Sequence, residues 1–139
     1  MLGKERMCAA IQAHCDTLSA RDKDGWLALW SEDAILEDPV GTPPFEGKDA
    51  LRTRFWKMIE AITPMHLWLE REPVICGDNA IAVLWGVVSP GGRLSRVGPI
   101  YDHFRFDEAG KFVSMRAFWT YDPAHLPSFM TPEAAGQHE

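Results

Sequence analysis

The chain is short of cysteine, tyrosine and basic residues. Its 139 residues include 3 cysteines and 2 tyrosines. The cysteines are odd in number and form no Cys-x-x-Cys pair, which argues against a disulfide framework and against a zinc or thioredoxin-type site. The 14 basic residues face 20 acidic residues, for a formal charge of -6. Because an acidic surface repels phosphate backbones, nucleic acid is not an expected partner.

Long apolar segments are also missing. The longest apolar run extends from Ala80 to Val88, whereas a membrane-spanning helix needs about 20 residues. The first residues contain no apolar signal core, so we expect a cytoplasmic protein with reduced thiols and no membrane partner. What the chain does have is 6 tryptophans and 7 phenylalanines. These aromatic residues could line a pocket for a flat apolar ligand or fill a core.

Apolar spacing predicts helices first and strands afterwards. The helical pattern covers residues 4–20, a short stretch around Trp26, Leu27 and Trp30, and residues 48–62. Alternation and turn residues predict strands at 33–38, 66–76, 80–88, 94–106 and 111–121. This order indicates a single α+β domain over residues 1–121, in which a long curved sheet wraps around the helices and encloses an apolar pocket. Residues 122–139 are expected to form a Pro-rich polar tail on the surface.

Asp102 is a carboxyl group in a file of large apolar residues. The two-residue period of a strand places Asp102 on the same face as Ile100, Phe104 and Phe106. Burial raises the pKa of a carboxyl group, and a neutral carboxylic acid can donate a hydrogen bond. Asp102 is therefore a candidate catalytic acid. Alternatively, it pairs with an arginine or with backbone amides, or a bulge turns it outward.

Asp38 is a second candidate, at the end of a predicted strand. It shares a face with Ala34 and Leu36, and Pro39 restricts its backbone to an extended conformation. A carboxylate at a strand end beside an apolar cavity suits a general base. Alternatively, Asp38 only bonds nearby backbone amides in the Pro-rich turn that follows.

His14 is a third candidate, on the apolar stripe of the first predicted helix. It lies between Ile11 and Leu18, where a histidine is either a core residue or a catalytic one. Its neighbour Cys15 does not complete a metal site, because adjacent helical positions diverge by about 100°. The other histidines are scattered, so we do not expect a metal site. We also expect no organic cofactor.

Two segments resemble the ketosteroid isomerase (steroid Delta-isomerase) family. Glu37 to Gly47 is similar to the segment that carries the family's catalytic base. Asp102 to Gly110, followed by Met115 to Trp119, is similar to its acid-bearing strand, hairpin and final strand. That second pattern is shared across the nuclear-transport-factor-2-like and polyketide-cyclase-like superfamily. The resemblance implies a cone-shaped sheet around three helices, a homodimer, and a steroid or related ketone as the small apolar ligand.

The resemblance also implies roles for individual residues. Asp38 matches the proton-shuttling base, Asp102 the protonated acid of the oxyanion hole, and His14 the position of the family's oxyanion-hole tyrosine. Where supporting tyrosines often occur, this chain has Trp30 and Phe55. Substrate contacts are expected from five aromatic residues, namely Trp119, Trp30, Phe55, Trp85 and Phe104.

The expected activity is to move a C=C bond of a ketone from the β,γ to the α,β position, by proton transfer through a dienolate. One alternative is a polyketide-cyclase-like or dehydratase-like enzyme in which a His–Asp pair shuttles protons. Another is a non-catalytic binder of an apolar small molecule, which the missing tyrosines favour. A third is a scaffold that works only through dimerisation.

Overall fold

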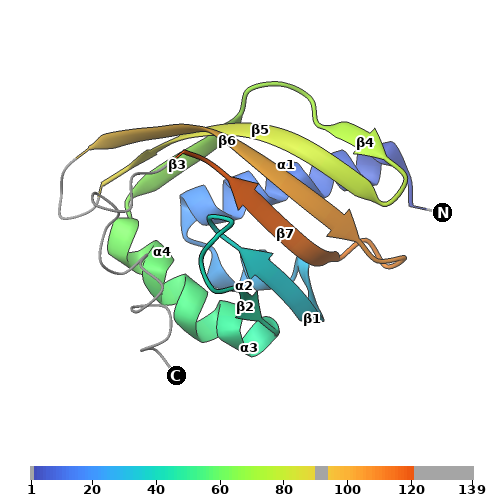
Figure 1. Ribbon diagram of the computed structural model, residues 1–139, viewed down its shortest axis with the longest axis horizontal. Helices are drawn as coiled ribbons and strands as arrows, with labels where there is room; N and C mark the ends of the chain where they lie inside the picture. The colour runs from blue at the N-terminus through green and yellow to red at the C-terminus, as the bar shows by residue number, and fades with distance from the viewer. Residues whose placement is uncertain (1, 90–93, 121–139) are drawn as a thin grey trace.

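The computed structural model describes residues 2–89 and 94–120, so the expected tail at 122–139 lies outside the described residues. The first half of the chain supplies the helices: α1 (Lys4–Ala20), α2 (Lys23–Leu27) and a third helical stretch over residues 48–62 (Figure 1). This third stretch consists of α3 (Lys48–Ala50), the π-helical turn η1 (Leu51–Phe55) and α4 (Trp56–Ile62). Helices form where apolar residues recur every three or four positions, which gives each helix one face to bury.

The strands that the structure describes form one mixed sheet. They are β1 (Trp30–Glu37), β2 (Phe45–Glu46), β3 (Met65–Leu69), β4 (Val74–Cys76), β5 (Asn79–Val88), β6 (Ser95–Phe106) and β7 (Phe112–Phe118). Their order is β2-β1-β7-β6-β5-β3, with β4 also paired with β5. Strands β1 and β7 pair in parallel, and the other pairs are antiparallel. The predicted α+β fold with a curved sheet and three helices is confirmed.

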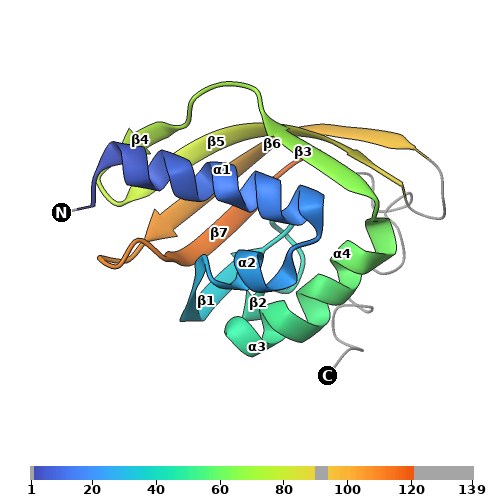
Figure 2. The same ribbon diagram turned by 180° about the vertical axis from the view of Figure 1, so that it is seen from behind.

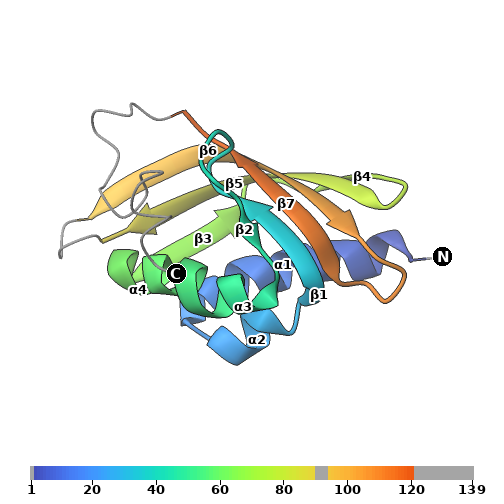
Figure 3. The ribbon, with the colours of Figure 1, turned by 60° about the horizontal axis from the view of Figure 1, so that its bottom comes forward.

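The helices cover one side of the sheet. Figure 2 shows α1 crossing in front of β5, β6 and β7, and Figure 3 shows the same helices gathered beneath the curved strands. Buried residues of α1 recur at helical spacing, including Met7, Ile11, Cys15 and Leu18. On the sheet, β5 and the end of β6 from Asp102 to Phe106 alternate between buried and more exposed side chains. The core therefore fills the concave side of the sheet.

Two predicted elements differ from the structure. The strand expected at 66–76 is two strands, β3 and β4, because the charged segment before Pro73 interrupts the pairing with β5. Proline has no backbone N–H to donate to a ladder, which makes it a natural break in a strand. Trp30, expected on the second helix, is the first residue of β1. Helix α2 ends three residues earlier, at Leu27.

Candidate functional site

An apolar cavity of about 260 Å³ lies between the concave sheet and helices α1 and α4. Most of its lining is aliphatic, from residues such as Ile59, Leu84 and Val97. Among these apolar groups lie three titratable side chains, His14, Asp38 and Asp102. The three candidates, which are far apart in the sequence, therefore converge on one cavity.

Asp102 lies on β6 with its side chain turned inward, and it is 2% exposed. Its register partners are Ala82 on β5 and Ala117 on β7, whose small side chains leave space around the carboxyl group. Within the described residues, Oδ1 is buried and has no hydrogen-bond partner. Burial, and secondarily the charge of Asp38, raise the pKa of Asp102 well above its ordinary value. A raised pKa favours the protonated carboxyl group, which has a proton to donate.

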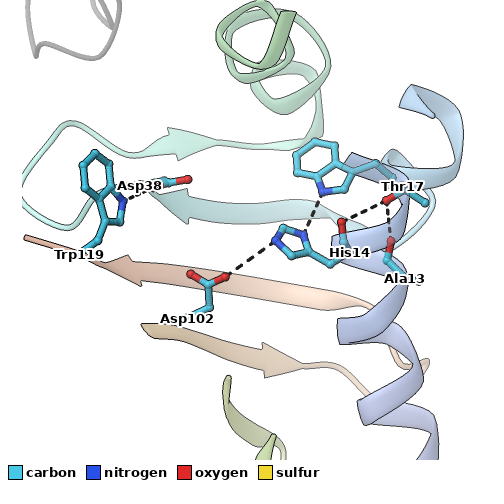
Figure 4. A network of polar contacts seen from close by, with 7 residues as sticks. Ala13, His14, Thr17, Asp38, Asp102 and Trp119 are labelled. Atoms are coloured by element: carbon cyan, nitrogen blue, oxygen red, sulfur yellow. Dashed lines mark hydrogen bonds and ion pairs between the residues drawn. The ribbon is translucent and has the colours of Figure 1, made fainter. Parts of the chain in front are cut away.

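His14 faces Asp102 from helix α1 and is also 2% exposed. Its Nε2 lies 3.9 Å from Oδ2 of Asp102 (Figure 4). On the other side of the ring, Nε1 of Trp26 donates a hydrogen bond to Nδ1 of His14 over 3.1 Å. Burial lowers the pKa of His14 to about 4, so the ring is neutral at pH 7. Because Nδ1 accepts, the ring proton lies on Nε2, the nitrogen that faces Asp102.

With Asp102 protonated, His14 and Asp102 together would form a pair of neutral donors. The 3.9 Å between Nε2 and Oδ2 is too long for a good hydrogen bond between them. It is short enough for a single oxygen to accept from both. Such an oxygen, at ordinary hydrogen-bond length from each donor, would see the two at an angle of about 90°. The pair can thus hold a carbonyl oxygen and stabilise the negative charge that develops on it.

Asp38 follows the last residue of β1 and is partly buried. Nε1 of Trp119 donates a hydrogen bond to Oδ1 of Asp38 over 2.9 Å. Figure 4 shows these two side chains together, on the side of Asp102 that is away from His14. Burial raises the pKa of Asp38 to about 6, although the hydrogen bond from Trp119 opposes this rise. At pH 7 about 90% of such a group is ionised. Asp38 is therefore a carboxylate that is ready to take a proton and basic enough to hold it.

The aromatic candidates are divided between the cavity and other places. Trp119 and Phe55 line the cavity. Trp30 packs in the core against Trp26, and Phe104 presents its ring to His14 with the two rings in an edge arrangement. Neither Trp30 nor Phe104 belongs to the cavity lining.

Trp85 lies on the outer face of the sheet, where its Nε1 donates to Glu70 over 2.9 Å and the Arg96 guanidinium lies over its ring. It alternates along β5 with the buried Leu84 and Gly86, and this alternation turns it away from the cavity. The aromatic part of the candidate site therefore consists of Trp119 and Phe55.

Sequence reasoning missed the partner of His14. Trp26 fits a predicted helix stripe and looks like an ordinary core residue. The available signal was its indole N–H, which needs an acceptor when a tryptophan is buried.

Within residues 2–89 and 94–120, no three His, Cys, Asp or Glu side chains come together as metal ligands. No helix in that same part of the chain has the length and apolar character needed to cross a membrane.

The chain is similar to known proteins. Residues 11–115 match the family model of the SnoaL-like domain. A steroid Delta-isomerase of Nocardioides simplex is 30% identical over 111 residues, which cover 80% of this chain and 87% of that protein.

Two solved structures have a similar fold. The protein RV0760c of Mycobacterium tuberculosis, solved in complex with estradiol-17beta-hemisuccinate, has a TM-score of 0.74 and 27% identity, over 84% of this chain and 95% of that one. The epoxide hydrolase/cyclase-like enzyme SalBIII has a TM-score of 0.76 and 21% identity, over 86% and 95% of the two chains. At that identity, the second likeness concerns the fold.

Proposed function

The chain belongs to the SnoaL-like family, with a nuclear-transport-factor-2-like fold and distant homology to a steroid Delta-isomerase, and we propose that it isomerises a β,γ-unsaturated ketone to its α,β-unsaturated form. The observation that carries this proposal is the convergence of His14, Asp38 and Asp102 on a single apolar cavity. Burial raises the pKa of both aspartates and lowers that of His14, which favours one base and two neutral donors. A flat, uncharged ketone suits such a lining. The steroid derivative bound by RV0760c supports a steroid or a compound of similar shape.

The proposed reaction has two proton transfers. The Asp38 carboxylate takes a proton from the carbon between the carbonyl and the C=C bond, and the C–H electrons form a dienolate. The Asp102 O–H and the His14 Nε2–H donate to the enolate oxygen, where a preorganised donor is typically worth about 2.7–4 kcal/mol. Protonated Asp38 then returns its proton to the γ carbon, and the C=C bond comes into conjugation with the carbonyl. The proton and both electrons of the broken bond stay within substrate and enzyme, so the reaction needs no redox cofactor.

The state of His14 favours this reaction over a His–Asp proton shuttle. A shuttle requires a histidine nitrogen that faces the substrate with a free lone pair. In His14 the cavity-facing Nε2 carries the proton and Nδ1 accepts from Trp26. His14 is therefore suited to donate rather than to act as a base. A non-catalytic binder remains the second candidate, and the experiment below separates the two.

The experiment follows the conversion of 5-androstene-3,17-dione by the absorbance of the conjugated enone. Asp38→Asn should abolish turnover, while quenching of tryptophan fluorescence by 4-androstene-3,17-dione should show that binding is retained. The matched control is Asp33→Asn, since Asp33 is an exposed aspartate on the same strand. Near-normal turnover by Asp38→Asn would reject the assignment. Steroid binding by the unaltered chain without turnover would favour the non-catalytic binder.

We also propose a homodimer through the outer face of the sheet. Ile35, Ile81, Tyr101 and Phe118 are more than two-fifths exposed. They alternate with buried residues of their strands, so they lie on the face opposite the helices. Sedimentation equilibrium of the chain and of Tyr101→Arg tests this: a dimer that the substitution converts to a monomer supports the interface, and an unaltered chain that sediments as a monomer contradicts it.

A further inference from the structure

The turn between α1 and α2 reverses the chain, so that α2 lies beside the part of α1 that carries His14. Arg21 ends α1 with a left-handed backbone conformation, at φ 56°. The N–H of Asp22 donates to the Thr17 carbonyl over 2.8 Å, and the Asp22 carboxylate then accepts from the Gly25 N–H over 3.0 Å. This compact turn starts α2 directly against α1, and Trp26 on α2 meets His14 on α1.

The indole of Trp26 is held firmly in place. Trp26 is fully buried. It stacks on Phe55 with ring centroids 5.1 Å apart and an interplanar angle of 17°, and it packs against Trp30 and Trp56. These contacts on several sides fix the direction of the indole N–H, which donates to Nδ1 of His14. A rotated ring would leave a buried donor without an acceptor.

The imidazole of His14 is equally confined. The rings of Phe104 and Phe112 meet it edge-on, at centroid distances of 5.4 and 6.1 Å. With this plane fixed, the ring has one nitrogen toward Trp26 and the other toward Asp102. With the ring held in this orientation, the position of its proton decides what His14 offers to the cavity.

The two tautomers have opposite consequences for the cavity. With the proton on Nε2, His14 and Asp102 both donate toward the cavity. With the proton on Nδ1, two N–H groups would oppose each other at Trp26, and Nε2 would become an acceptor for the Asp102 O–H. The Asp102 O–H would then point at Nε2 of His14, and neither residue would donate to the substrate.

We propose that Trp26 is a positioning residue, whose indole N–H keeps His14 in the Nε2–H tautomer and so keeps two donors directed at the substrate oxygen. The kinetic part of this inference rests on the proposed isomerase function; the tautomer itself does not. Trp26 lies behind His14, outside the cavity lining, and its N–H reaches the substrate oxygen only through the imidazole.

The chain offers a matched control in Trp30. This second tryptophan is 1% exposed and lies next to Trp26, with ring centroids 5.2 Å apart. Within the described residues, its buried Nε1 has no hydrogen-bond partner. Trp26→Phe and Trp30→Phe therefore make the same change of ring within the same cluster, but only Trp26→Phe removes a hydrogen bond that is donated to His14.

The first measurement is the tautomer of His14, from the ¹⁵N shifts of its ring nitrogens and their couplings to ring protons. The unaltered chain should show a protonated Nε2 and an unprotonated Nδ1, and Trp30→Phe should show the same. Trp26→Phe should show a mixture of the two tautomers. A protonated Nδ1 in the unaltered chain overturns the proposal, and this result does not depend on whether any variant folds or any substrate turns over.

The second measurement is the rate of enone formation. Losing one neutral hydrogen bond from Trp26 should lower kcat by about 3- to 10-fold. The KM should stay within about twofold, because the donors act mainly on the developing enolate. In a His14→Ala background, Trp26→Phe should change kcat by less than about twofold, since residues that act through one another are not additive.

The results that contradict the proposal differ from those that contradict the isomerase. An Nε2–H tautomer that persists in Trp26→Phe, or an equal loss of kcat with and without His14, overturns the role of Trp26. Absence of turnover in the unaltered chain, together with the expected ¹⁵N shifts, overturns the isomerase and leaves the tautomer assignment intact.

Discussion

Replacing Asp38 by asparagine should change how stability depends on pH. Burial raises the pKa of Asp38 from 3.8 to about 6 in the folded chain. Between these two values the folded state binds more protons than the unfolded state, so stability falls as pH rises. A pKa difference of this size corresponds to about 3 kcal/mol. The carboxyl group thus stabilises the fold most below about pH 4 and loses that contribution as the pH passes 6.

Asparagine at this position stays neutral at every pH and lacks this loss. The unfolding free energy of Asp38→Asn should therefore gain about 2.4 kcal/mol on the unaltered chain between pH 4 and pH 7.5. Asp102 is present in both proteins, so the part of its pH dependence that does not come from Asp38 cancels in the difference. The assay is urea unfolding followed by circular dichroism at half-unit pH steps.

A difference between the two proteins that does not vary with pH would refute the argument. It would mean that the folded pKa of Asp38 is not raised, and that the carboxyl group is solvated or well paired. A difference of opposite sign would mean that the folded state stabilises the carboxylate, which would leave a poor base. Asp33→Asn, at an exposed position, should show neither effect.

Three further predictions concern activity. The kcat/KM for the ketone should rise with pH through a midpoint near 6, the pKa of Asp38. His14→Ala should leave that midpoint in place, because the pKa of His14 lies at about 4 rather than at 6.5. A midpoint that moves in His14→Ala would contradict the assignment of Asp38 as the base. Trp119→Phe removes the donor that lowers the pKa of Asp38, so the midpoint should move upward, whereas Trp85→Phe on the outer face should not move it. Asp102→Leu should lower kcat by about 100- to 1000-fold, and its thermal unfolding should occur at a higher temperature, because an unpaired buried oxygen is removed. Asp102→Asn keeps an N–H donor, so its kcat should fall less. Equal losses of kcat in the two variants would argue against a donor role.

Periodicity was enough to find the polar site. The alternation around Asp102 placed it among buried aromatic residues, and the structure confirms that it faces inward between Ala82 and Ala117. The helical phase of His14 likewise turned it toward the core. A charged or polar residue in an apolar file is informative, because an unpaired polar group is costly to bury.

The same reasoning failed where every residue is apolar. The run from Ala80 to Val88 contains no polar residue to mark its outer face, so the sequence did not reveal that Trp85 points away from the cavity. The contact between Trp26 and His14 depends on the left-handed conformation of Arg21, a non-glycine residue that gives no local sign of it. Side-chain partners across a turn are a tertiary property that periodicity does not carry.

The environments of the two aspartates explain why they would take different roles. Asp102 is buried and its Oδ1 has no hydrogen-bond partner among the described residues, so burial favours its protonated form. Asp38 is less enclosed and accepts from the Trp119 indole, which stabilises the carboxylate and limits the rise of its pKa. The two groups are also coupled, because the charge on Asp38 raises the pKa of Asp102 further. Ionisation of the base therefore helps to keep the acid protonated, so one cavity can hold a proton acceptor and a proton donor of the same residue type at the same pH.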